Sequence, residues 1–214
     1  MTHDATPDPA AEACPIETPA ATDASPRDRL VSAATRLFCA KGIAATGIDA
    51  VLREAGVAKM TLYKIFGSKD RLVEAVLEEE GRRWREWFLP ALLAGSQPPR
   101  EKLARIFPLL REWFERADFY GCPFINAVGE HDKSDPRMRA LALRHKAVVL
   151  DAISGLAAQG GAKDPASVAH QLGVLIDGAI VATMITRDPA IAEVAAQAGQ
   201  AVLDRALAGN ARPR

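Results

Sequence analysis

Apolar residues recur every three or four positions along most of the chain, which is typical of helices that bury one face. Ser25 and Pro26 form a cap and first-turn pair, and the apolar stripe after them predicts a helix that ends at Lys41 and Gly42. The sequence has no strict alternation of the kind that predicts strands. We therefore expect an all-α fold with nine or so helices.

The stretch from Thr46 to Leu72 predicts two short helices, a tight turn between them, and the start of a third helix. Apolar positions within 48–55 keep helical spacing, and we expect Thr46 to cap the first turn. Gly56 follows directly, and a glycine at this point is the usual left-handed helix stop. The chain should therefore turn sharply after the first short helix.

The second short helix begins at Ala58 and places Leu62 and Phe66 on one face, with cationic and hydroxyl groups on the others. A helix-turn-helix of this kind lays its second helix, here called the reader helix, in the major groove. Ser68 should cap the next helix, where Lys69 and free N–H groups make a phosphate site. The predicted DNA-binding residues are Thr46, Lys59, Met60, Thr61, Tyr63, Lys64, Ser68 and Lys69.

Residues 55–72 read A-G-V-A-K-M-T-L-Y-K-I-F-G-S-K-D-R-L. This closely resembles the A-G-V-x-x-x-T-L-Y-x-x-F-x-S-K-x-x-L signature of tetracycline-repressor-like (TetR family) transcriptional regulators. The chain departs from the family pattern at Ile65, where His or Tyr is frequent, and at Gly47, where Thr is frequent. The resemblance implies an N-terminal DNA-binding domain, a C-terminal ligand-binding domain, and homodimers formed through the last two long helices.

Charge is distributed unevenly, although 27 basic and 27 acidic side chains give a formal net charge of zero. Residues 25–72 hold nine basic side chains against four acidic ones, so the predicted DNA-binding region is locally basic. Neutralising DNA phosphates needs such an excess, and binding should then weaken steeply with salt. A solvated helical face is the alternative interpretation of these charges.

Residues 1–25 are rich in Ala, Pro, Thr and Asp, and we expect an acidic, disordered tail that is either inert or competes with DNA. The three cysteines are scattered without C-x-x-C spacing, which indicates neither a disulfide framework nor a zinc site. We expect no metal and no cofactor. The N-terminus lacks the pattern of a signal peptide and no run of 18 apolar residues occurs, so we expect a cytoplasmic protein without a membrane span.

Periodicity beyond the helix-turn-helix predicts further helices, separated by Gly- and Pro-bearing breaks. We expect Pro90 to end the first of them and Pro108 to kink the second. The predicted ranges are 68–89, 100–117, 137–159, 165–186 and 189–207, with a short apolar segment after the turn at 120–126.

Nine of the twelve aromatic residues fall between Trp84 and Phe124. We interpret this cluster as an aromatic-lined cavity for an apolar or aromatic ligand, an interpretation that the family resemblance favours. The alternative is that the rings simply fill the core. The predicted apolar wall is Trp84, Trp87, Phe88, Phe107, Trp113, Phe114, Phe124 and Met184, and the predicted orienting polar groups are Tyr120, Asn126 and His145.

The segment from Leu172 to Ile185 is apolar nearly all round and contains several small residues. A surface helix needs one apolar stripe, so this breadth predicts packing against a second subunit. A helix central to one subunit would give the same pattern. The predicted dimer interface is Leu172, Leu175, Ile176, Ala179, Ala182, Val194 and Val202.

The sequence thus predicts a tail at 1–25, a helix-turn-helix DNA-binding domain at 26–72, and a helical regulatory and dimerisation domain at 73–214. No G-x-S-x-G, H-E-x-x-H, phosphate-loop or dinucleotide motif is present, so an enzyme is not expected. We predict a transcriptional regulator, a repressor by family default, that binds a palindromic operator as a homodimer and is released by a small molecule. The alternative is a ligand-independent, architectural DNA-binding protein.

Overall fold

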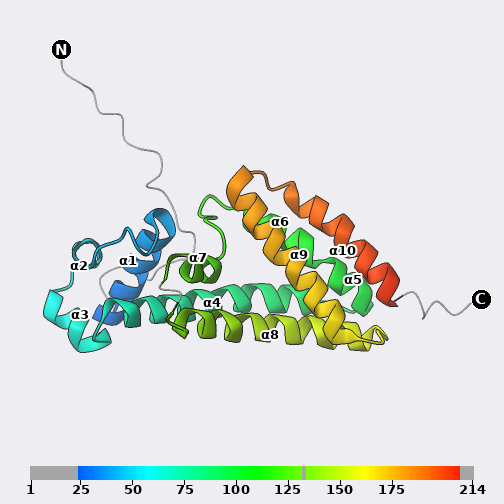
Figure 1. The fold of residues 1–214 in the computed structure, drawn as a ribbon, viewed down its shortest axis with the longest axis horizontal. Coiled ribbons are helices and arrows are strands. Elements are labelled where there is room, and N and C mark those ends of the chain that lie inside the picture. The colour runs from blue at the N-terminus through cyan, green and yellow to red at the C-terminus, as the bar shows by residue number, and fades with distance from the viewer. Residues whose placement is uncertain (1–23, 132–133, 208–214) are drawn as a thin grey trace, which may run out of the picture.

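The computed structural model describes residues 24–131 and 134–207, and every regular element in these ranges is a helix (Figure 1). This confirms the expected all-α class. Most of the predicted tail, residues 1–23, lies outside the described residues. The helices are α1 (Pro26–Lys41), α2 (Ile48–Ala55), α3 (Lys59–Phe66), α4 (Lys69–Leu93), α5 (Pro99–Ala104), α6 (Ile106–Phe114), α7 (Pro123–Glu130), α8 (Arg137–Gln159), α9 (Pro165–Thr186) and α10 (Ile191–Leu207).

The first three helices gather at one end of the molecule, around the start of the long helix α4 (Figure 1). Helix α4 then runs into the larger C-terminal domain with α8 alongside it, while α9 and α10 pack together across them. Helix α7 lies between the two groups, over the middle of α4. Helix α4 therefore joins α1 and α3 to the helices of the C-terminal domain.

The N-terminal domain holds together around a small apolar core. Leu30 of α1, Leu62 of α3 and Leu72 of α4 are fully buried, and each such side chain contributes about 1.5–3 kcal/mol relative to an exposed one. Ser25 accepts a hydrogen bond from the backbone N–H of Asp28 at 3.2 Å, which confirms the predicted cap of α1. The reader helix is thus fixed on its support through one buried face.

Two prolines act differently from the prediction. Helix α4 continues through Pro90 to Leu93, because a proline in the last turn removes one backbone hydrogen bond while buried Phe88 and Leu92 hold the helix in place. Pro108 does not kink a continuous helix. The predicted helix is instead interrupted at the single residue Arg105, between α5 and α6. Pro108 becomes the third residue of α6, where its missing N–H would lack a helical partner in any case.

Helix α9 is the one helix in the described residues that is long and apolar enough, by length and composition, to cross a membrane. A core helix passes the same test. Leu172, Ile176 and Ile180 are buried inside the subunit, and α9 packs on α6, α8 and α10. This packing accounts for the apolar residues on the inner face of α9.

Candidate DNA interface and ligand cavity

The turn before the reader helix has the geometry that the sequence predicted. Gly56 adopts the left-handed conformation with φ 60° and ψ 41°, and its N–H contacts the carbonyls of Arg53 and Leu52 at the end of α2. Ala58 is extended, and α3 begins at Lys59. Since a side chain costs energy in this left-handed conformation, the glycine sets the angle between α2 and the reader helix.

The outer face of α3 carries the predicted reading side chains. Met60 is 80% exposed and Tyr63 is 42% exposed, while Lys59 and Lys64 are also exposed and Thr61 is half-buried. The ammonium of Lys59 lies 3.7 Å from the carboxylate of Asp49, and both side chains are largely in solvent. Such an exposed pair is weak, so a DNA phosphate can take the place of the carboxylate.

The structure corrects the prediction for Thr46. Gly47 occupies the cap position of α2 without any side-chain hydrogen bond, so the predicted Thr46 cap is wrong. Thr46 is only 2% exposed, and its hydroxyl donates to the carbonyls of Gly42 at 2.7 Å and Leu37 at 3.3 Å. The hydroxyl therefore ties the α1–α2 connection to the end of α1 and does not face the DNA side.

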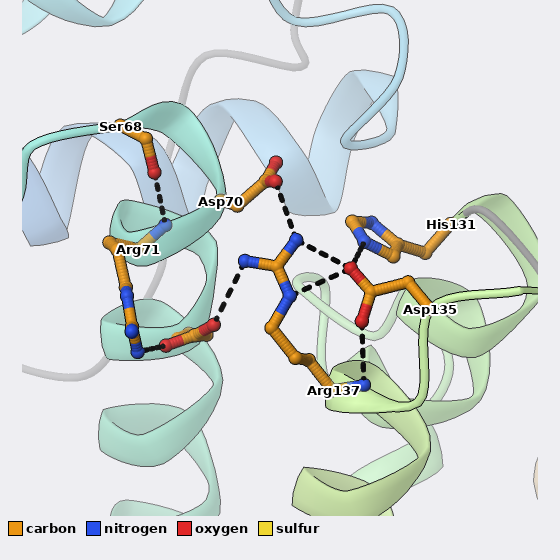
Figure 2. Close-up of polar contacts among 7 residues, drawn as sticks. Ser68, Asp70, Arg71, His131, Asp135 and Arg137 are labelled. Atoms are coloured by element: carbon orange, nitrogen blue, oxygen red, sulfur yellow. Dashed lines mark hydrogen bonds and ion pairs between the residues drawn. The ribbon is translucent and has the colours of Figure 1, made fainter.

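At the start of α4, where the sequence predicts a phosphate site, the cap is as expected but the lysine contact differs. Ser68 accepts a hydrogen bond from the backbone N–H of Arg71 at 3.2 Å, which confirms its capping role (Figure 2). The Lys69 ammonium, however, donates to the carbonyl of Ile43 at 2.6 Å. The sequence reasoning also passed over Arg71, an exposed cation in the same turn.

A cavity of about 1210 Å³ lies between α1, α4, α7, α8, α9 and the segment that follows α6. This volume exceeds that of ordinary drug-sized sites, which span roughly 300–1,000 Å³. Seven of the eleven predicted residues line it, and they include all three tryptophans of the chain. These seven are Trp84, Trp87, Trp113, Tyr120, Phe124, Asn126 and His145.

The other four predicted cavity residues pack behind the wall. Phe88 is fully buried and stacks on Trp84 with ring centroids 4.4 Å apart, and Phe114 packs on Phe119 at 4.9 Å. Phe107 lies against Gly199 of α10, and the sulfur of Met184 lies against Gly121. Clustering along the chain identified the aromatic region, but the helical phase directs these side chains into the core.

His145 is held in one protonation state by its neighbours. Its ring stacks on Phe124 at 4.2 Å, and its Nδ1 lies 2.8 Å from the guanidinium of Arg85. Arginine can only donate, so Nδ1 accepts and the proton resides on Nε2. Burial, with the positive charges of Arg85 and Lys146, lowers the pKa of His145 to about 4. The imidazole is therefore neutral at pH 7.

The cavity wall also contains charged groups that the sequence reasoning missed. Arg116 donates to Asp118 at 3.1 Å, and Arg83 lies 3.7 Å from Glu80, whose pKa is raised mainly by burial. Glu80 and Arg83 come one turn before Trp84 and Trp87, so helical spacing from the aromatic residues could have identified them. Lys146 and Asp177 form a further ion pair on the α8 and α9 side.

Helix α1 of the N-terminal domain forms part of the same cavity. Thr35, Phe38, Cys39 and Ala40 of α1 line it, and so does Ile43 in the connection that follows the helix. The sequence did not predict this contact, because α1 is separated by many residues from the aromatic cluster. A molecule bound in the cavity would contact both domains directly.

Comparisons with known proteins agree with this architecture. Residues 30–76 match the family model "Bacterial regulatory proteins, tetR family", and residues 99–199 match "Tetracyclin repressor-like, C-terminal domain". A solved TetR-family transcriptional regulator from Streptomyces coelicolor is 32% identical with a TM-score of 0.77, and the match covers 85% of this chain and 96% of that one. The chain belongs to the TetR family of transcriptional regulators.

Further TetR-type relatives match over most of the chain. A putative tetr-transcriptional regulator from Streptomyces avermitilis is 32% identical with a TM-score of 0.76, and the match covers 86% of this chain and 98% of that one. The HTH-type transcriptional regulator BetI from Rhizobium meliloti is 28% identical over 76% of this chain and 80% of that protein. The protein is therefore a DNA-binding transcriptional regulator of the helix-turn-helix type.

Within this TetR fold, the predicted dimer residues fall into two groups. Leu172, Ile176 and Ala179 are buried inside the subunit, so they cannot contact a second subunit. The prediction is wrong for them because the apolar breadth of α9 did not reveal which face of the helix points inward. Leu175, Ala182 and Val202 are half-buried, and Val194 is 64% exposed. The exposed positions on the outward face of α9 are instead Val174, Gly178 and Ile185, with the half-buried Val181 between the last two.

Proposed function

We propose that this TetR-family regulator is a cytoplasmic repressor that binds a palindromic operator as a homodimer and is released by a small apolar or aromatic molecule. The observation that carries the proposal is the cavity lined by helices of both domains. Phe38 of α1 and Ile43 of the α1–α2 connection share it with Trp84 and His145 of the C-terminal domain. A ligand that favours one arrangement of these helices can thereby change the position of the reader helix.

For DNA binding, we assign residues 26–72 as the reading domain and residues 73–214 as the regulatory and dimerisation domain. Helix α3 would enter the major groove with Lys59, Met60, Thr61 and Lys64 at base edges or nearby phosphates. Among these, Lys59 would contact a phosphate in place of its exposed partner Asp49. Tyr63 would contact a phosphate, and Lys69 would do so by releasing the carbonyl of Ile43. One short helix makes few base contacts, so two half-sites are needed for tight binding.

A second copy of the chain would supply the second reader. Val174 and Ile185 of α9 are 72% and 73% exposed, and Val194 of α10 adds a third large apolar side chain on the neighbouring helix. Exposed apolar surface of this kind is typical of a subunit interface. The proposed dimer therefore uses the outward faces of α9 and α10.

The chemistry of the cavity supports a ligand without net charge. Three tryptophans and Phe124 supply apolar walls, and charged side chains of the lining include the ion pairs Arg116–Asp118 and Lys146–Asp177. The neutral His145 can donate from Nε2. A differential affinity of about 1–3 kcal/mol between the two reader arrangements would give an ordinary allosteric response.

The first test measures binding to DNA from immediately upstream of the gene and to a scrambled duplex, at two salt concentrations. We expect selective, salt-sensitive binding to the upstream DNA. Lys59→Ala should flatten the salt slope by about one on every sequence, whereas Met60→Ala should mainly relax base preference. Lys163→Ala, an exposed lysine between α8 and α9, is the matched control and should change neither.

The possible outcomes separate the proposals. Equal binding to both duplexes would favour an architectural DNA-binding protein, and equal effects of Lys59→Ala and Met60→Ala would reject the assignment of the reader helix.

Ligands can be screened by tryptophan fluorescence, because all three tryptophans line the cavity. A compound that changes this fluorescence but leaves operator binding unchanged would argue against release by a cavity ligand.

A further inference from the structure

A cluster of charged side chains joins the first turns of α4 to the start of α8 (Figure 2). The Arg137 guanidinium on α8 donates to Asp70 of α4 at 2.9 Å and lies 3.6 Å from Glu74, one turn further along α4. Asp70 directly follows Lys69 of the predicted phosphate site. One side chain of the C-terminal domain therefore holds the end of α4 that faces DNA.

Arg137 is oriented from its own side by Asp135. The two oxygens of Asp135 accept from the backbone N–H of Arg137 at 2.9 Å and from its Nε at 2.7 Å. These hydrogen bonds hold the pKa of Asp135 well below its usual range, so the carboxylate stays charged. His131 is half-buried, with its Nε2 3.3 Å from Oδ2 of Asp135. Figure 2 shows Arg137 pointing from this support toward α4.

A second contact joins the end of α7 to the chain that precedes α2. Oε2 of Glu130 accepts from the backbone N–H of Ala44 at 2.8 Å. A Cβ at Gly42 would come within 3.1 Å of the same carboxylate, so the glycine permits this close approach. Because Lys69 donates to the carbonyl of Ile43 beside it, α4 and α7 hold the same α1–α2 connection.

Both contacts belong to helices that also line the cavity. Helix α7 carries Phe124 and Asn126 in the cavity wall and ends at Glu130. Helix α8 carries His145 eight residues after Arg137, roughly 12 Å along the helix axis. The side chains that hold the reading domain therefore lie on the same rigid elements as the side chains that would contact a ligand.

We propose that Arg137 and Glu130 are positioning residues for DNA recognition, which fix the orientation of the reading domain so that two reader helices match one half-site spacing. The inference rests on the dimer and the two half-sites of the proposed function. Asp70 and Arg137 are 43% and 41% exposed, and exposed ion pairs contribute little to folding stability. Their effect should therefore appear in the geometry of DNA binding and not in the stability of the fold.

The test compares affinity for the full operator with affinity for a duplex in which one half-site is scrambled. Binding to one half-site uses one reader and is insensitive to the spacing of the pair, whereas the operator requires both. We expect Arg137→Gln and Glu130→Ala to lower the ratio of operator to half-site affinity by about 5-fold or more, the lower range of ordinary allosteric effects. The variants should also discriminate less against operators with one inserted base pair.

Arg82→Gln is the matched control, because Arg82 pairs with Glu79 and Glu86 of its own helix α4 and is 50% exposed. It should keep the wild-type ratio. If Arg137→Gln does not fold, Asp135→Ala removes the support of Arg137 and leaves the arginine in place. Circular dichroism melting verifies that each tested variant is folded.

An unchanged ratio of operator to half-site affinity in both folded variants would overturn the inference, whether both affinities stay at the wild-type values or fall by the same factor. In either case the wild-type protein would still prefer the operator, and the proposed function would stand. A wild-type protein that does not distinguish the operator from one half-site would instead reject the proposed dimeric recognition, and the inference with it.

Discussion

The neutral state of His145 makes a quantitative prediction about stability at low pH. Its pKa is about 4 in the folded protein against an ordinary value of 6.5, mainly because of burial. Below pH 6.5 the unfolded chain takes up a proton that the folded protein does not, so acidification favours unfolding. With these two pKa values, His145 alone should cost about 2 kcal/mol of stability between roughly pH 7.5 and pH 5.

Urea unfolding of the wild-type protein and His145→Gln at these two pH values measures this contribution. The loss on acidification should be about 2 kcal/mol larger for the wild-type protein than for the variant, because glutamine does not titrate. His170→Gln is the matched control, since His170 also lines the cavity but is exposed. All measurements need the same protomer concentration, because dimerisation contributes to apparent stability.

The comparison with the variant is needed because Glu80 acts in the opposite direction. Burial raises the pKa of Glu80, so its folded form takes up a proton more readily than its unfolded form. Acidification through that raised pKa therefore stabilises the folded state. The difference between wild type and His145→Gln cancels this effect. Identical pH dependence in the two proteins would refute the buried, neutral His145.

Two further predictions concern the turn before the reader helix and the dimer surface. Gly56→Ala should destabilise the protein by about 1 kcal/mol in urea unfolding because Gly56 has φ 60°. Gly155→Ala is the matched control and should not destabilise the protein, because Gly155 is exposed within α8 and an added Cβ there has no atom within 4 Å. Ile185→Glu should leave the fold intact, since Ile185 is 73% exposed and does not line the cavity, but shift sedimentation toward the monomer. Unchanged sedimentation would exclude the outward face of α9 from the interface.

Local signals in the sequence were sufficient for most of the helices. Caps and helix stops such as Ser25, Gly56 and Ser68 act through the nearest backbone groups, and all three have the predicted role. The predicted cap at Thr46 is wrong because the extended residue that precedes α2 is Gly47, one position later. The predicted helix end at Pro90 is wrong because buried neighbours hold α4 together beyond it. A rule based on local sequence does not include such packing.

The cavity was less predictable because it depends on which way each side chain faces. Aromatic clustering identified the right segment, yet Phe88 and Phe107 turn into the core while Trp84 and Trp87 line the space. The participation of α1 depends on long-range packing, for which the sequence carried no signal. Apolar breadth likewise identified α9 as a packing helix but assigned buried Ile176 to the surface.

The α1–α2 connection is where the cavity and the reader meet most directly. Ile43 lines the cavity, its carbonyl accepts from Lys69, and the next residue, Ala44, donates to Glu130. A ligand that displaces α7 must therefore either break the Glu130 contact or move this connection with it. Either change acts immediately before α2, which leads through the Gly56 turn into the reader helix. In the proposed mechanism a small local shift at this connection would therefore re-aim the reader helix, without a long path through the core.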